Sequence, residues 1–173
     1  MLGKQLMGAA GALAAAVTLA LLWWFRDAFA GPGPMSVDAG GRLEYMLTWL
    51  LLPGLSLLVG VWAAARRGFH RDAIDGTRTP ASPALEINLR YNTNTVEQVL
   101  LAAIAWAGLA LKLPSEMLFV IPMLAVVFFV GRMLFFVAYL IYPIARVYGM
   151  VLTIVPTMIA YGWLAWRLAT RGA

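Results

Sequence analysis

Five apolar runs, each about long enough to cross a lipid bilayer, account for most of this sequence. An α-helix needs roughly 20 residues to cross the hydrocarbon core, and it satisfies its own backbone hydrogen bonds there. The hydrophobic fraction is 62% and the charged fraction is 12%, whereas an average soluble domain is about 25% charged. We therefore expect an all-α integral membrane protein. Its five predicted spans cover residues 5–25, 45–65, 90–113, 117–142 and 147–167.

The first run allows two interpretations. Lys4, an apolar core and Ala28-Phe29-Ala30 are together typical of a cleavable signal peptide. The core is long, however, and it ends in Trp23-Trp24, an aromatic pair of the kind found at membrane interfaces. We expect this run to be retained as an additional transmembrane helix.

Basic residues set the expected orientation, because cytoplasmic connections carry an excess of Lys and Arg. The densest basic segment connects the second and third spans, so we place loop 66–90 in the cytoplasm. High Ala, Gly and Arg content with little Lys is typical of a GC-rich bacterial genome, which favours a bacterial inner membrane. The chain then divides into an N-terminal transmembrane segment (1–30), an extracytoplasmic loop (31–42) and a four-helix domain (43–173).

Composition also excludes several classes of function. The formal net charge is +5, but the cations gather at helix ends, which indicates contact with membrane lipids rather than nucleic acid. The chain has no cysteine and a single histidine. It therefore offers no thiol nucleophile, and a metal site of several histidines is impossible, so we expect no metal.

The opening of the third span carries a polar stripe. Arg90, Asn94 and Glu97 are spaced by four and three residues, which places them on one helix face, with Gln98 beside them. Such groups are costly at a bilayer edge unless they have partners. The stripe is either an interhelical polar cluster or a site for a zwitterionic ligand, in which an arginine grips a carboxylate and a glutamate holds an ammonium group.

A second group of candidates follows in the last two spans. Arg132, Phe135 and Tyr139 share a face of the fourth span, and Arg146 opens the fifth. We expect Arg132 to be a structural partner for a carboxylate such as Glu97. Arg146 is either a headgroup anchor or a group that stabilises an anion such as a thiolate. The remaining pair, Arg66-Arg67, ends the second span and is by itself typical of a cytoplasmic anchor.

Taken together, these stretches resemble the MAPEG family, the membrane-associated proteins in eicosanoid and glutathione metabolism. Ala65-Arg66-Arg67-Gly68-Phe69 is similar to the basic end of the family's first helix. Arg90, Asn94 and Glu97 match its Arg-x-x-x-Asn-x-x-Glu signature. Arg132, Tyr139 and Arg146 match the spacing of its third helix and the start of its fourth. The resemblance covers residues 42–171.

The resemblance implies a four-helix membrane bundle that assembles as a homotrimer, here with one additional N-terminal helix. It implies glutathione as co-substrate, bound between subunits, and a lipophilic substrate that enters from the membrane. The catalytic residues would be Arg146, which stabilises the thiolate, and Arg67. The residues that bind glutathione would be Arg66 from the neighbouring subunit, Arg90, Asn94, Glu97, Gln98, Phe135 and Tyr139.

Two departures from the family pattern leave alternatives open. The family often has tyrosine where this chain has Gln98, and a tyrosine of its third helix is here Phe135, which cannot donate a hydrogen bond. Our first hypothesis is a membrane glutathione transferase with possible peroxidase activity. The alternative is a non-catalytic lipid-binding or scaffold subunit that recruits a partner protein through the N-terminal helix. A transporter ranks last, because no span carries a ladder of ionisable groups. The thiol could also be a low-molecular-weight thiol other than glutathione.

Overall fold

The computed structural model describes residues 1–29, 31, 33–69, 74–75 and 82–171, and throughout these ranges its regular structure is helical. Each of the five long helices is long and apolar enough to cross a membrane, which supports the predicted integral membrane protein. In chain order the elements are α1 (Leu2–Trp24), η1 (Arg26–Phe29), α2 (Ala39–Ala65), η2 (Arg66–Phe69), α3 (Pro83–Lys112), η3 (Ser115–Met117), α4 (Val120–Ile141) and α5 (Arg146–Arg171).

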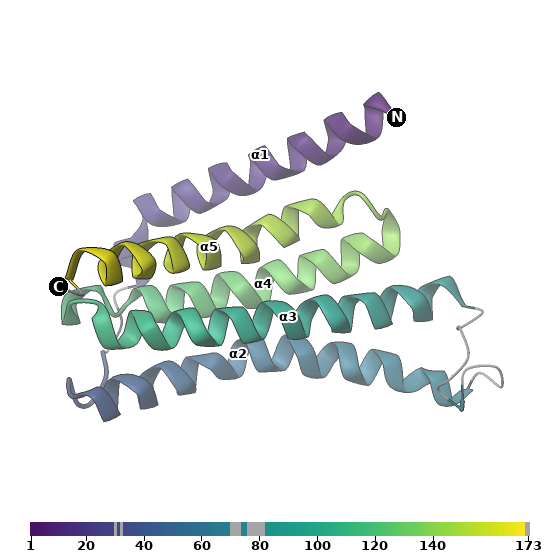
Figure 1. The fold of residues 1–173 in the computed structure, drawn as a ribbon. Helices are drawn as coiled ribbons and strands as arrows, with labels where there is room; N and C mark the ends of the chain where they lie inside the picture. The colour runs from purple at the N-terminus through teal and green to yellow at the C-terminus, as the bar shows by residue number, and fades with distance from the viewer. Residues whose placement is uncertain (30, 32, 70–73, 76–81, 172–173) are drawn as a thin grey trace.

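Helices α2 to α5 lie side by side as a bundle, and α1 lies outside them against α5 (Figure 1). At one end of the bundle α2 ends, α3 begins, and α4 turns into α5. We call this the Arg146 end. At the other end, α3 turns into α4 through η3, and α1 connects to α2. We call this the Trp163 end, after a residue in the last turns of α5.

Two helix starts differ from the sequence-based predictions. Helix α2 begins at Ala39, inside the stretch 31–42 that was expected to be a loop, because Asp38 caps it. The Asp38 carboxylate accepts a hydrogen bond from the Gly41 amide at 2.7 Å, and this bond offsets the cost of two adjacent glycines. Helix α3 begins at Pro83 rather than Arg90, since proline is favoured in the first turn, where no amide proton is needed.

Arg42 holds the Trp163 end together. Its Nε donates to the Val37 carbonyl at 2.8 Å, and its Nη1 donates to the carbonyls of Ala110 at 3.1 Å and Leu113 at 2.6 Å. Its Nη2 donates to the Ser115 hydroxyl at 2.7 Å. The last carbonyls of a helix lack partners within the helix, so one guanidinium caps α3 and ties it to the start of α2.

Helix α1 attaches to α5 through small residues and one hydrogen bond. A Cβ placed on Gly11 would lie 3.6 Å from the backbone nitrogen of Tyr148, and Ala15 is completely buried. The Thr18 hydroxyl donates to the Ala14 carbonyl at 2.9 Å, so the Tyr148 hydroxyl donates to Thr18, also at 2.9 Å. Close approach through small residues is the usual way in which membrane helices associate.

Helices α4 and α5 cross at two glycines. A Cβ on Gly149 would overlap the Gly131 carbonyl oxygen and lie 2.5 Å from the Phe135 amide nitrogen. These are backbone atoms, which cannot rotate away as a side chain would. The crossing therefore depends on the absence of a side chain at Gly149.

We predict that Gly149→Ala separates α4 from α5 and lowers the free energy of unfolding by about 1–3 kcal/mol, as overpacking does. The matched control is Gly162→Ala in the same helix, where an added Cβ meets no atom within 4 Å. Thermal unfolding in detergent measures both variants. Equal midpoints for the two variants would show that the crossing tolerates a methyl group.

Candidate functional site

Three helices bring an arginine, a tyrosine and a second arginine together at the Arg146 end. The Arg146 guanidinium lies over the Tyr139 ring, with its carbon 4.2 Å from the ring centroid. The Arg90 guanidinium of α3 also interacts with the Tyr139 side chain. It also bonds Glu86, one turn earlier, at 2.7 Å. The structure thus brings two cations, from α3 and α5, beside the same tyrosine of α4.

The local sequence explains why α4 and α5 meet here. Tyr142 leaves the helical conformation with φ −149° and ψ 111°. The residue before a proline is disfavoured in the α region, and Pro143 cannot supply an amide proton to continue the ladder. The turn is short, since α5 begins at Arg146. The cation at the start of α5 therefore stays beside the last turn of α4, which carries Tyr139.

Arg132 lies beneath this group and is completely buried. Its Nη1 donates to the Asn94 side-chain oxygen at 3.0 Å, and its Nη2 donates to the Thr95 hydroxyl at 2.8 Å. The expected partnership with Glu97 is wrong. In the described part of the chain Arg132 forms its hydrogen bonds with neutral groups of α3, and Glu97 is exposed.

Aromatic rings complete the surroundings of Arg132. Its guanidinium carbon lies 4.2 Å from the Phe135 ring centroid and 5.2 Å from that of Tyr91. A guanidinium is weakly hydrated and interacts well with ring faces, which lowers the cost of burying it. Phe135, noted in the sequence as a lost hydrogen-bond donor, therefore packs against Arg132 and contacts the Tyr139 ring at a centroid distance of 5.7 Å.

The bond from Arg132 fixes the direction of Asn94. An amide has one accepting oxygen and a donating nitrogen. Because the oxygen of half-buried Asn94 accepts from Arg132, its nitrogen is left to donate elsewhere. Glu97 is exposed on the same face of α3, whereas Gln98 is buried, with a side-chain oxygen that has no hydrogen-bond partner among the described residues. The polar stripe of α3 is thus exposed at Glu97, half-buried at Asn94 and buried at Gln98.

The two arginines at the end of α2 lie in η2. Arg66 is exposed and Arg67 is half-buried. The Asn88 amide is oriented with its oxygen toward the Arg66 guanidinium, and this oxygen accepts a hydrogen bond from the Arg66 Nε at 3.0 Å. Asn88 is completely buried and was not among the predicted site residues. Asn88 precedes Arg90 by two residues and therefore fell outside the helix expected from the sequence. Ser82-Pro83 is a typical helix start, and a helix predicted from there would have included Asn88.

Comparison with protein families decides the identity of the bundle. The sequence model of the MAPEG family matches residues 45–166, which extend from α2 to the last turns of α5. The chain belongs to the MAPEG family. The resemblance stated from the sequence is therefore confirmed. This membership identifies a membrane protein of glutathione-related metabolism. No curated protein and no solved structure gives a significant match.

The MAPEG match also separates α1 from the rest of the chain, since residues 2–24 precede the matched region. The polar groups of the candidate site, from Arg66 to Arg146, all lie within the match. Arg90 and Arg146, which both interact with Tyr139, suit an anionic ligand because a guanidinium stays charged and can bind a carboxylate bidentately.

We predict that Arg132→Lys lowers the free energy of unfolding by about 1.5–3 kcal/mol, because hydrogen bonds to a charged group are worth that much and one ammonium cannot bridge Asn94 and Thr95 as a planar fork does. Arg167→Lys, at a partly exposed position in α5, is the control and is expected to change stability by less than about 0.5 kcal/mol. Thermal unfolding compares them. An unchanged midpoint for Arg132→Lys would contradict the bridging role.

Proposed function

We propose that this MAPEG protein is a membrane glutathione transferase, which activates the thiol of glutathione for attack on a lipophilic substrate. The observation that carries the proposal is the group formed by Arg90, Tyr139 and Arg146 at one end of the bundle. The group draws on α3, α4 and α5, so its geometry depends on how these three helices pack. The family, named in part for glutathione metabolism, supports the choice of thiol.

Glutathione carries two carboxylates, an ammonium group, two amides and a thiol. Arg90 would bind a carboxylate, exposed Glu97 would hold the ammonium group, and the free nitrogen of Asn94 would donate to a carbonyl. Arg132 would act behind them, because it fixes the Asn94 amide at 3.0 Å. Of the remaining α3 and α4 candidates, Tyr139 would line the site, while buried Gln98 and Phe135 would support it from behind.

Arg146 would stabilise the thiolate. The reactive form of a thiol is the anion, and a nearby cation lowers the pKa of a thiol below its usual value of about 8.5. Arg146 suits this role because it remains charged and is already positioned on the Tyr139 ring at 4.2 Å. Arg67, half-buried in η2, would stabilise developing charge on the lipophilic substrate.

We further propose that the protein is a homotrimer and that Arg66 of one subunit completes the site of the next. The outward face of α3 supports an interface between subunits. It exposes Glu97 together with Val96, Leu100 and Ile104. A carboxylate within a membrane span is costly against lipid, so this face is better suited to protein contact and to a polar ligand.

We predict that Arg146→Ala lowers kcat for glutathione conjugation of a generic electrophile at neutral pH by about 100-fold, comparable to the loss of one preorganised electrostatic donor. The pH–rate profile reports the cause. The rate rises with pH as the thiol ionises, and without Arg146 its midpoint moves up toward about 8.5. Stopped-flow ultraviolet absorbance of the bound thiolate measures the same shift directly.

Arg167→Ala is the control for this experiment, because it removes a cation from the same helix at the Trp163 end. An Arg146→Ala variant with the turnover and pH profile of the wild type would exclude the thiolate role. Failure of the wild type to bind glutathione at millimolar concentration would exclude the proposed function altogether. Binding without turnover would instead favour the non-catalytic alternative.

A site shared between subunits predicts complementation. Arg66→Ala and Arg146→Ala chains, each impaired alone, should recover part of the activity when they are co-expressed, because some mixed trimers contain a complete site. The matched pair Arg90→Ala and Arg146→Ala should not recover, since these two residues come from one chain. Turnover per purified trimer compares the two mixtures. Equal recovery, or none in either, would contradict sharing through Arg66.

A further inference from the structure

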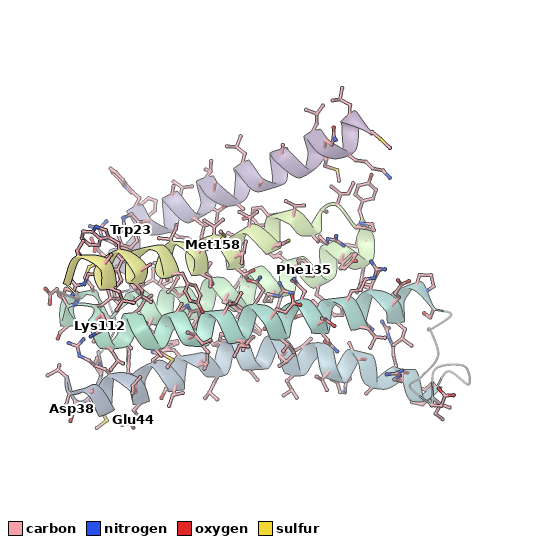
Figure 2. The ribbon with its side chains drawn as sticks, in the orientation of Figure 1. Trp23, Asp38, Glu44, Lys112, Phe135 and Met158 are labelled. Atoms are coloured by element: carbon pink, nitrogen blue, oxygen red, sulfur yellow. The ribbon has the colours of Figure 1, made fainter. Side chains whose placement is uncertain are left out.

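A cavity of about 570 Å³ lies between α1 and the bundle at the Trp163 end. Every residue that lines it is apolar. Its walls include Ala20 and Trp23 of α1, Leu113 after α3, Met123 of α4, and Ile159 and Trp163 of α5. In Figure 2, Trp23 and Lys112 lie at this end of the molecule, whereas Phe135 lies farther toward the Arg146 end. The cavity is therefore separate from the proposed glutathione site.

The size and lining of this cavity suit an apolar ligand. Pockets for small molecules occupy about 300–1,000 Å³ and are lined mainly by hydrophobic and aromatic side chains. A cavity with such walls does not hold ordered water, because water needs polar partners. Two wall residues remain accessible from outside, Ile159 with 66% and Trp23 with 46% of its surface exposed. A ligand can thus reach the cavity from the bilayer.

The cavity exists because of α1. Five of its wall residues belong to this helix, which lies outside the region matched by the family. The wall includes Ala16 and Ala20, whose small side chains leave the space unfilled. Helix α1 is nevertheless held in place, since Thr18 bonds Tyr148 at 2.9 Å and Ala15 is buried. The space is a built feature of the α1–bundle contact.

Cations stand beside both tryptophans of the wall. The Arg26 guanidinium carbon lies 5.3 Å from the Trp23 ring centroid, and that of Arg167 lies 5.2 Å from the Trp163 ring centroid. Arg26 is also 4.0 Å from the Asp27 carboxylate, a distance at which the pair is weak. Tryptophan and arginine together mark the headgroup level of a membrane. The apolar cavity therefore has a cationic rim.

We propose that this cavity binds the acyl chain of a lipid with an anionic head, with the carboxylate or phosphate beside Arg26 and Arg167. The apolar walls account for the chain, and the cationic rim accounts for the head. Binding needs neither glutathione nor Arg146, so the proposal is independent of the transferase function. Helix α1 would then serve as one wall of a lipid site added to the family bundle.

Native mass spectrometry of the full chain in detergent tests the proposal with three probes that share one palmitoyl chain. These are palmitate, lysophosphatidylglycerol and zwitterionic lysophosphatidylcholine. We expect one molecule of an anionic probe to bind per chain with saturation. The zwitterionic probe should bind about tenfold more weakly, because its choline cation is repelled by the two arginines; a factor of ten corresponds to about 1.4 kcal/mol. Preference for palmitate would assign the head as a carboxylate, and preference for lysophosphatidylglycerol as a phosphate.

The variant Ala20→Phe fills the cavity, and its expected effect is a loss of affinity for the anionic probes of about tenfold or more. Ala14→Phe, which adds the same ring to an exposed position of α1 outside the cavity, is the matched control and should bind as the wild type does. The double variant Arg26→Gln/Arg167→Gln should retain the palmitoyl chain and lose the preference for an anionic head.

Three results would overturn the proposal. These are equal binding of all three probes by the wild type, binding by Ala20→Phe that matches Ala14→Phe, and an unchanged anionic preference in the arginine double variant. Because that double variant alters only partly exposed side chains, it tests the rim even where Ala20→Phe fails to fold.

Discussion

A buried arginine held by neutral groups is the interaction on which the rest of this bundle depends. Arg132 on α4 donates to Asn94 and Thr95 on α3 and lies against the rings of Phe135 and Tyr91. Inside a membrane protein a charge must be matched by hydrogen bonds or polarisable neighbours. Here neutral oxygens supply the hydrogen bonds and aromatic faces supply the polarisable neighbours. Glu97 therefore does not pair with Arg132 and lies at the surface.

The aromatic residues near Arg132 extend this connection to the other helices. Tyr91 donates its hydroxyl proton to the Ser56 carbonyl of α2 at 2.8 Å, beside Gly60, where an added Cβ would overlap the Tyr91 ring and Asn92. Phe135 contacts Tyr139, whose ring supports Arg146 of α5. Through Tyr91 toward α2, and through Phe135 and Tyr139 toward α5, the buried cation is therefore linked to all four helices of the family bundle.

The spans could be predicted from the sequence, because a helix is the structure in which a long apolar run satisfies its own backbone hydrogen bonds inside a bilayer. The family signature likewise indicated Arg90, Tyr139 and Arg146, which the structure brings together. Helix starts were less predictable. Asp38 overrides the Gly40-Gly41 signal through a single capping bond, and Pro83 can begin a helix as readily as it can end one. The partner of Arg132 was beyond sequence reasoning. A guanidinium held by Asn, Thr and ring faces leaves no charge pattern in the sequence, so only the tertiary contacts reveal it.

The hydrogen bond between Thr18 and Tyr148 joins α1 to the same helical turn that carries Arg146, two residues earlier in the chain. The residues of one turn move together, because backbone hydrogen bonds connect positions four apart. Helix α1 thus braces, from outside the family region, the turn that positions a cation on the opposite side of α5. A shortened protein whose limits are taken from the family match at residue 45 would lack this brace. The family match begins at residue 45, whereas the set of helices that hold this turn in place begins with α1.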